Sequence, residues 1–222
     1  MRNVVMPPAR PVQWRLRPTE SARTTVQTLR SGELHVTIEH APLEGVTPEM
    51  LAWWYSNVNG TMRYVEATYP RYLVWHPLDH ISYEVVKAAP NGRVAPGAKL
   101  HIIEALGREP RNLIDIVPTV EQLDATGAVV GRRIFGTPVV LLENVFEAIP
   151  RGTRYVSRLT VGGSTPFGRL FLNRIARGRA LPDWKVNPWW IRHHIEEIGN
   201  LENFLPDLFR RFSDPSPNGP DA

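Results

Sequence analysis

One helical segment near the C-terminus, WWIRHHIEEIGNLENFLP from Trp189 to Pro206, places the strongest constraint on the fold. Successive residues of an α-helix are rotated by about 100°, so the apolar residues of this segment collect on one face. This apolar stripe consists of Trp190, Ile191, Ile195, Ile198, Leu201, Leu205 and Leu208. The pattern predicts a long amphipathic helix that buries one face.

Four ionisable side chains fall within five consecutive positions of this helix. His194 lies near the middle of the apolar stripe, Glu197 lies near its edge, and Glu196 points away into solvent. His193 and Glu197 are four residues apart, so their side chains can converge on one point beside the core. An isolated buried charge is costly, and a divalent metal ion would satisfy both groups. The alternative is a helix salt bridge beside a core histidine.

The composition excludes several classes of protein. The 222 residues are 42% hydrophobic and 22% charged, as in an ordinary soluble globular protein. Cysteine is absent, which excludes disulfides, iron–sulfur clusters and thiol nucleophiles. No apolar run approaches the length of a membrane span, and the N-terminus lacks the apolar segment of a secretory signal. We therefore expect a cytoplasmic protein with no membrane partner.

The N-terminal residues 1–32 differ from the rest of the chain in being basic. Before residue 31 the only acid is Glu20, against the six arginines Arg2, Arg10, Arg15, Arg17, Arg23 and Arg30. Such a segment can bind nucleic acid, but Trp14 is its only aromatic residue and no DNA-binding motif follows. We expect an extended basic arm that is solvated or wraps a partner, and no nucleic-acid partner.

The middle of the chain is dominated by strand patterns. ELHVTIEHA, from Glu33, alternates apolar and polar residues and predicts a half-buried strand. In AKLHIIEAL, Glu104 shares the parity of Leu100 and Ile102, which places a carboxylate on the apolar face unless the strand ends there in a bulge. VEQLDATGAVVGRRIF, and PVVLLENVFEAI with TRYVSRLTV, predict further antiparallel pairs.

Other segments predict helices and a break. In GVTPEMLAWWYSNVNG, Thr47 as N-cap and Pro48 at the first helical position predict a helix that ends at Asn59-Gly60. FGRLFLNRIARG predicts a second helix. RYLVWHPLDHISYEVVK predicts two extended runs broken at Pro77, because proline lacks an amide donor. His76 and His80 flank this break, where they suit either a metal or a simple turn.

These elements predict an α+β fold in which an antiparallel curved sheet grips a long C-terminal helix, with an N-terminal extension. We expect a single metal-binding domain over residues 33–212. SDPSPNGPDA, residues 213–222, has the composition of a disordered tail. A curved sheet around a helix encloses a cavity, and Glu104, Glu197 and either His193 or His194 would lie in it.

Three separated signatures carry a resemblance to a known family. PLEGVTPEMLAWWY, RYLVWHPLDH and HHIEEIGNLENFLP are similar to segments of the 2,4-diacetylphloroglucinol hydrolase family, which includes phloretin hydrolase. The resemblance extends from about Leu34 to Arg210. It implies a Bet v 1/START-like helix-grip fold, a zinc ion held by two histidines and two glutamates, and hydrolysis of a carbon–carbon bond between an acyl group and a phenolic ring.

The resemblance implies four metal ligands in this sequence. RYLVWHPLDH supplies His80, with His76 as a second choice, and the strand glutamate matches Glu104. The helix supplies His193 and Glu197. Two imidazoles and two carboxylates suit zinc, with iron or manganese as competitors.

The chain departs from the family at one position. The hydrolases use a further histidine from the middle of the sheet as general acid/base, and this chain has none between His101 and His193. The nearest matching segment, LLENVFEAIPRGTRY, offers Glu143 as a substitute. We therefore expect weak or absent activity on diacetylphloroglucinol and phloretin.

We predict a metal-dependent hydrolase that cleaves a carbon–carbon bond in an acylphenol or polyketide-like ketone, using a metal-activated water. The predicted catalytic residues are Tyr72 and Glu143. The predicted substrate-binding residues are Trp54, Tyr83, Asn144 and Tyr155. Two other functions suit the same cavity: a polyketide cyclase or isomerase that uses the same metal, and a non-catalytic carrier of an apolar ligand. The sequence leaves a homodimer open.

Overall fold

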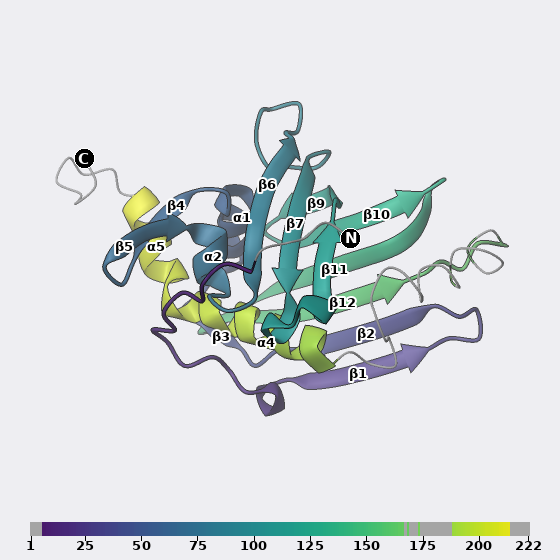
Figure 1. Ribbon diagram of the computed structural model, residues 1–222, viewed down its shortest axis with the longest axis horizontal. Helices are drawn as coiled ribbons and strands as arrows, with labels where there is room; N and C mark the ends of the chain where they lie inside the picture. The colour runs from purple at the N-terminus through teal and green to yellow at the C-terminus, as the bar shows by residue number, and fades with distance from the viewer. Residues whose placement is uncertain (1–5, 167, 169–172, 174–187, 214–222) are drawn as a thin grey trace.

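The computed structural model describes residues 6–166, 168, 173 and 188–213 (Figure 1). The strands in this part of the chain are β1 (Arg23–Thr28), β2 (Leu34–Glu39), β3 (Leu43–Glu44), β4 (Thr61–Tyr64), β5 (Ala67–Pro70), β6 (His80–Lys87), β7 (Lys99–Ala105), β8 (Leu113–Ile116), β9 (Thr119–Asp124), β10 (Gly127–Ile134), β11 (Thr137–Ile149) and β12 (Gly152–Val161). The α-helices are α1 (Pro48–Asn57), α2 (Arg71–Trp75), α4 (Pro188–Asn200) and α5 (Leu205–Ser213). Short 3-10 helices are η1 (Thr19–Ser21), η2 (Leu106–Arg108), η3 (Pro110–Asn112) and η5 (Leu201–Asn203).

Most of the strands form one antiparallel sheet. Its path runs β1-β2-β12-β11-β10-β9-β7-β6, with β3 paired to β12 and β8 paired to β7. Strands β4 and β5 form a separate hairpin. The register of β6 on β7 shifts between His80 and Ser82 and again between Val85 and Lys87. Such irregularities bend a strand and increase its twist, which suits a sheet that curves around a helix.

Helix α4 lies across this sheet, between β6 and β7 on one side and β1 and β2 on the other (Figure 1). Near its start, Trp190 and Ile195 pack in a cluster with Val36 of β2 and other residues. Toward its end, Ile198 packs in a second cluster with Trp54 of α1. The structure therefore confirms the α+β fold with an antiparallel sheet gripping the C-terminal helix, and the predicted apolar stripe forms the core.

The start of α1 is as the sequence predicts. The helix begins at Pro48, and the Thr47 hydroxyl accepts a hydrogen bond from the amide of Met50 at 3.3 Å. The β9–β10 and β11–β12 hairpins also lie where the strand patterns place them. Local turn and cap chemistry suffices for these elements because their signals come from residues next to each other in the chain.

Residues 71–75 do not form the predicted extended run. They form the helix α2, which is held by distant partners: the indole of Trp75 donates to the Glu197 carbonyl at 2.8 Å, and Asn200 donates to the Trp75 carbonyl at 2.9 Å. A helix of five residues is too short to leave a periodic pattern. Contacts with α4 therefore decide its conformation, and the local sequence does not.

The described part of the expected N-terminal arm, residues 6–32, packs against the rest of the protein. Strand β1 pairs with β2 along its whole length, so part of this segment completes the sheet. The Trp14 ring stacks on Phe204 with centroids 5.8 Å apart, and Arg17 donates to the Ala41 carbonyl at 2.9 Å. The expected boundary at residue 32 therefore falls within the sheet, between β1 and β2, and two of the basic side chains, Arg10 and Arg17, donate to backbone carbonyls of the same chain. The predicted helix over residues 167–178, apart from 168 and 173, and the tail over 214–222 lie outside the described residues.

Arg10 provides a test of this packing. Its side chain is buried and donates to the His80 carbonyl at 2.5 Å, so Arg10→Ala should remove a charge-assisted hydrogen bond and lower the free energy of unfolding by about 1–3 kcal/mol. Urea denaturation measures the change. Arg15→Ala is the matched control, because Arg15 is exposed and its loss should cost less than about 0.5 kcal/mol. Equal effects of the two changes would contradict a specific role for Arg10.

Candidate metal centre

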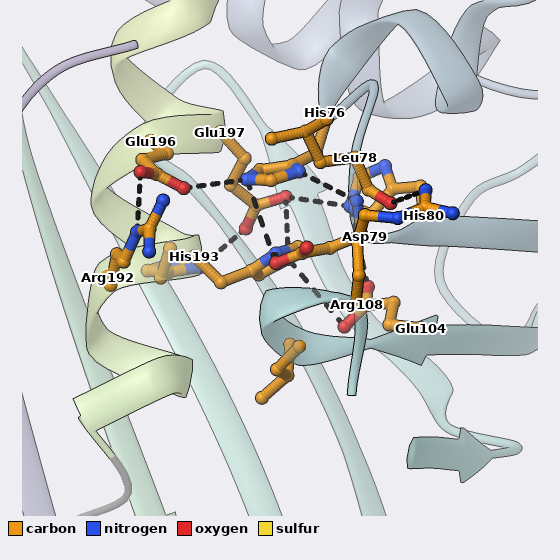
Figure 2. A network of polar contacts seen from close by, with 12 residues as sticks. His76, Leu78, Asp79, His80, Glu104, Arg108, Arg192, His193, Glu196 and Glu197 are labelled. Atoms are coloured by element: carbon orange, nitrogen blue, oxygen red, sulfur yellow. Dashed lines mark hydrogen bonds and ion pairs between the residues drawn. The ribbon is translucent and has the colours of Figure 1, made fainter. Parts of the chain in front are cut away.

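Four side chains from three elements converge on one point (Figure 2). His80 begins β6 and faces Glu104 of β7 in the strand register, while His193 and Glu197 lie one turn apart on α4. His80 Nε2 lies 3.6 Å from Glu104 Oε1 and 3.4 Å from Glu197 Oε2. His193 Nε2 lies 3.7 Å from Glu104 Oε2 and 3.8 Å from Glu197 Oε2. All four predicted ligands are therefore brought together.

The donor set fits one divalent metal ion. In a tetrahedral site with bonds of about 2.0–2.2 Å, the donor atoms lie about 3.3–3.6 Å apart, close to the separations seen here. The Nε2 atoms of His80 and His193 are buried and have no hydrogen-bond partner within the described residues. A buried polar atom without a partner is costly, and a metal ion would satisfy both nitrogens at once.

The opposite nitrogen of each imidazole is held by hydrogen bonding. His80 Nδ1 donates to the Tyr72 carbonyl at 2.6 Å, and His193 Nδ1 donates to Asp79 Oδ2 at 3.1 Å. In a neutral imidazole, a proton on Nδ1 leaves the lone pair on Nε2. Both rings are thus set in the tautomer that a metal needs, as is usual for histidine ligands.

The two carboxylates are also oriented by neighbours. The Tyr72 hydroxyl donates to Glu104 Oε1, and the Tyr72 ring stacks on His80 with centroids 3.8 Å apart. His194 Nδ1 donates to Glu197 Oε1 at 2.6 Å, which leaves Oε2 facing His80. Burial opposes ionisation of Glu197, but the hydrogen bond from His194 and the nearby imidazoles outweigh it and hold the pKa of this carboxyl well below its usual range.

His76 packs against His193, with ring centroids 4.4 Å apart, but it is a less suitable ligand than His80. The Asp79 amide donates to His76 Nδ1 at 3.1 Å, and His76 Nε2 donates to Glu196 at 3.1 Å. His76, Asp79 and His193 are close enough together to hold an ion. However, both nitrogens of His76 already have partners, so binding there would break an existing hydrogen bond.

Glu196 is not solvated as the helical projection predicts. Its side chain is 9% exposed and accepts hydrogen bonds from His76 and, at 2.7 Å, from Arg192 (Figure 2). The projection fails because His76, in the segment that joins α2 to β6, packs on this face of α4, and a helical wheel cannot show a covering segment from elsewhere in the chain.

In the metal-free protein, the charges of the cluster favour a protonated His193 and an ionised Asp79. Burial disfavours the protonated form of His193, but the carboxylates of Glu104, Asp79 and Glu197 outweigh it and raise the pKa of His193 to about 9. Burial works against ionisation of Asp79, yet its hydrogen bond from His193 and the nearby charge of His76 lower the pKa of Asp79 to about 2. A proton on His193 thus occupies the place that a metal ion would take.

A cavity of about 100 Å³ adjoins the cluster. Its polar wall includes Glu104, Glu197, His194 and Asn144. The remainder is mainly apolar and aromatic, from Tyr55, Val58, Tyr72, Trp75, Tyr83, Val94, Leu100, Ile102, Val120, Leu123, Ala128, Val130 and Leu142, together with Gln122. Convergent polar groups at one end of an apolar cavity are typical of a site for a small molecule.

Among the residues predicted to bind substrate or act in catalysis, Tyr72, Tyr83 and Asn144 line this cavity. Trp54 does not: it is fully buried and packs against Trp75 and Phe204 in the core. An apolar helix face points to burial, but it does not distinguish core from cavity wall.

Tyr155 is also absent from the cavity wall. It is fully buried, and its hydroxyl shares a hydrogen bond of 2.6 Å with the Tyr55 hydroxyl. Tyr55 lines the cavity in its place. Tyr155 therefore lies in the core, where Tyr55 of α1 is its hydrogen-bond partner.

Glu143 is on the wrong face of β11 to act in the cavity. Its strand neighbours Leu142 and Asn144 line the cavity, whereas Glu143 pairs across the register with Arg158 of β12. Successive side chains of a strand point to opposite faces. The prediction that Glu143 replaces the missing histidine is therefore not supported by its placement.

The sequence patterns missed several buried groups around the cluster. Asp79 directly precedes His80 in the segment already singled out, so its proximity to a ligand was the available signal. Ser157 has the same inward parity as Tyr155 on β12. His40 follows the last residue of β2, where strand parity gives no direction, and no pattern in the sequence connects it with α4.

The sequence profile of the DAPG hydrolase PhiG domain family matches residues 19–210. None of the curated proteins matches the sequence. Among solved structures, Ms6760 from Mycobacterium smegmatis is 15% identical, with a TM-score of 0.47 and coverage of 81% of this chain and 96% of its own. SA2116 from Staphylococcus aureus is 12% identical, with a TM-score of 0.44 and coverage of 81% and 96%. Ara h 8.0201 is 13% identical, with a TM-score of 0.40 and coverage of 86% and 100%.

Within the described ranges, none of the helices combines the length and the apolar character that crossing a membrane requires.

Removing one ligand should remove the metal. We expect about one divalent ion per chain in the untagged protein and far less in His80→Ala, because three donors hold an ion more weakly than four. Elemental analysis measures the content. The matched control is His101→Ala, since His101 pairs with Asp115 at 2.8 Å away from the cluster and should keep the ion. Loss of metal in both variants, or in neither, would contradict the site.

The raised pKa of His193 predicts a pH dependence of the metal-free protein. Its pKa lies at about 9 against an ordinary value of 6.5, so the stabilisation from protonated His193 is complete below about pH 6.5 and is lost as the pH rises through about 9. Urea unfolding of metal-free protein should show falling stability over this interval, and His193→Gln should flatten it. Zinc must displace this proton, so zinc affinity should rise over the same interval. An affinity that does not depend on pH would contradict this assignment.

Proposed function

The chain belongs to the DAPG hydrolase PhiG domain family, and on that basis we propose that it is a metal-dependent hydrolase of a carbon–carbon bond in an acylphenol or polyketide-like ketone. Membership of the family implies hydrolase activity. The metal is proposed from the cluster of His80, Glu104, His193 and Glu197. The substrate class is proposed from the cavity beside that cluster.

The observation that carries the proposal is the pair of buried, unpartnered Nε2 atoms of His80 and His193. They converge with Glu104 and Glu197 at the polar end of the cavity. Two imidazoles and two carboxylates suit zinc, with iron or manganese as competitors. Bound here, such an ion would polarise a carbonyl group and lower the pKa of a water molecule.

The polar side chains around the cavity can orient a phenolic substrate. The Tyr72 hydroxyl donates its hydrogen bond to Glu104, so its oxygen is left to accept a hydrogen bond from a substrate hydroxyl. Burial raises the pKa of Tyr83, which keeps its hydroxyl neutral and able to donate. Asn144 Oδ1 is buried without a partner among the described residues, and a second substrate hydroxyl would satisfy it.

The character of the wall favours an uncharged, flat substrate. Trp75, Ile102 and Leu142 contribute apolar surface, which favours the burial of an aromatic ring. No lysine or arginine is among the described residues that line the cavity, so a substrate carboxylate or phosphate would lack a counter-ion. A neutral acylphenol meets these conditions.

Proton transfer to the departing ring carbon is the weakest part of this site. His194 lines the cavity, but both of its nitrogens already have protein partners, Glu197 and Ser157. Glu143 lies on the other face of the sheet. A positioned general acid typically contributes about 10²–10⁴-fold in rate, so we expect slow turnover of diacetylphloroglucinol and phloretin, with Tyr83 or a water molecule as the proton source.

Turnover in oxygen-18 water tests the reaction. Zinc-loaded protein should convert an acylphloroglucinol into the deacylated phenol and a carboxylic acid that carries one labelled oxygen. Tyr83→Phe should lower kcat by about 10²-fold if its hydroxyl stabilises charge in the transition state. Tyr69→Phe is the matched control, because Tyr69 lies in the β4–β5 hairpin and does not line the cavity.

Two outcomes would overturn the proposal. A product without the label would indicate a cyclase or isomerase that uses the same metal. Stoichiometric binding without turnover of any acylphenol would indicate a carrier of an apolar ligand. Equal rates in the Tyr83 and Tyr69 variants would contradict only the role given to Tyr83.

A further inference from the structure

A row of buried polar groups leads from Glu197 away from the other metal donors. His194 Nδ1 lies 2.6 Å from Glu197 Oε1, and His194 Nε2 lies 2.8 Å from Ser157 Oγ. The same hydroxyl lies 3.0 Å from Nε2 of His40. These residues come from α4, from β12 and from the position after β2, so the row joins three elements that are far apart in the sequence.

The hydrogen bonds of this row have one consistent direction. An ionised carboxylate only accepts, so Glu197 must receive its bond from His194 Nδ1–H. The Nε2 atom of a neutral His194 then accepts a hydrogen bond from the Ser157 hydroxyl. The Ser157 oxygen in turn accepts from His40 Nε2–H. Each group therefore sets the orientation of the next, and the series ends on a predicted metal ligand.

The surroundings hold the row rigidly. The ring of Trp190 stacks on His194 with centroids 4.9 Å apart and planes 13° apart. The His40 ring meets His194 at 5.6 Å and the edge of Tyr155 at 5.3 Å. Ser157 is completely buried. Because packed rings fix the imidazoles on both sides, a lost partner cannot be replaced by a simple rotation of the ring.

We infer that His194, Ser157 and His40 together form a positioning relay for the metal centre, which holds Glu197 Oε1 so that Oε2 faces the two imidazoles. The inference rests on the proposed metal site. It concerns residues that contact neither metal nor substrate, apart from His194 at the cavity wall. They act through Glu197.

The other three ligands are held by residues of a single segment of the chain. Tyr72 orients both His80 and Glu104 through its carbonyl and hydroxyl, and Asp79, one position from His80 in the chain, orients His193. The support of Glu197, in contrast, runs through His194 and Ser157 to His40 and so reaches β12 and the end of β2, far from β6 and β7 in the strand order. The positions of β2 and β12 relative to α4 therefore affect the orientation of Glu197, one of the predicted metal ligands.

The test compares two buried hydroxyls on the same strand. Ser157→Ala breaks the relay. Thr153→Val is the matched control, because Thr153 is also completely buried on β12 and donates to the Val46 carbonyl at 2.7 Å. Zinc affinity is measured by competition with a chromophoric chelator, and the visible spectrum of the cobalt(II)-loaded protein reports the ligand geometry. Thermal unfolding of the metal-free proteins shows whether the two changes cost similar stability.

We expect Ser157→Ala to bind zinc about 10–100-fold more weakly, as is typical when a group that supports a metal ligand is lost, and to change the cobalt(II) spectrum. Thr153→Val should match wild type in both. His40→Phe breaks the relay one link further from Glu197 and should act in the same direction with a smaller effect, so the inference stays testable if Ser157→Ala does not fold.

Three results would overturn the inference. One is unchanged zinc affinity and cobalt(II) spectrum in both Ser157→Ala and His40→Phe. Another is an equal loss of affinity in Thr153→Val, since that would reflect general destabilisation. The third is a wild-type protein that binds no zinc, which removes the proposed function as well. A wild type that binds zinc and cleaves an acylphenol while the relay variants bind equally well would remove the relay alone.

Discussion

The carboxylates of Glu197, which is buried, and of Glu104, which is partly buried, lie next to two imidazoles, and the need to satisfy these four groups shapes the arrangement around them. Buried charge without a partner is among the most costly features a fold can carry. The chain meets this requirement by joining an edge of the sheet to α4 at one point, where His80 and Glu104 stand opposite each other in adjacent strands. The metal proposed here would complete the balance, since both Nε2 atoms are otherwise without partners among the described residues.

Helix α4 has two roles that cannot be separated. Trp190, Ile195 and Ile198 on its length are core residues of two apolar clusters, and His193 and Glu197 lie between them in the sequence. A change that shifts the helix against the sheet moves two ligands at once. The short helix α2 adds to this coupling, because Trp75 donates to the Glu197 carbonyl. Stability and the proposed metal binding therefore depend on the same packing, and pre-organisation of the site follows from the fold.

Around the four donors, each ligand has its own support, and the supports differ in reach. Tyr72 and Asp79 belong to the segment that leads to His80, and this one segment orients His80, Glu104 and His193. The support for Glu197 passes from His194 through Ser157 to His40. A network of buried polar groups is stable only when every member has a partner. This explains why so many polar residues lie at the centre of a core that is otherwise apolar and aromatic.

Much of this protein follows from local patterns. The apolar stripe of α4, the cap at Thr47, the two hairpins and the inward parity of Glu104 depend on neighbours in the chain, and the structure has all of them. Together with the family resemblance, the same patterns predicted four metal ligands, and the fold brings their side chains together. Tertiary structure alone decided the conformation of α2, the burial of Glu196 and the position of β1 in the sheet. It also decided that Trp54, Tyr155 and Glu143 do not line the cavity, and that His40 lies beside His194. In each of these cases the deciding partner lies far away in the sequence, and periodicity can show which face of an element is buried but not what covers it.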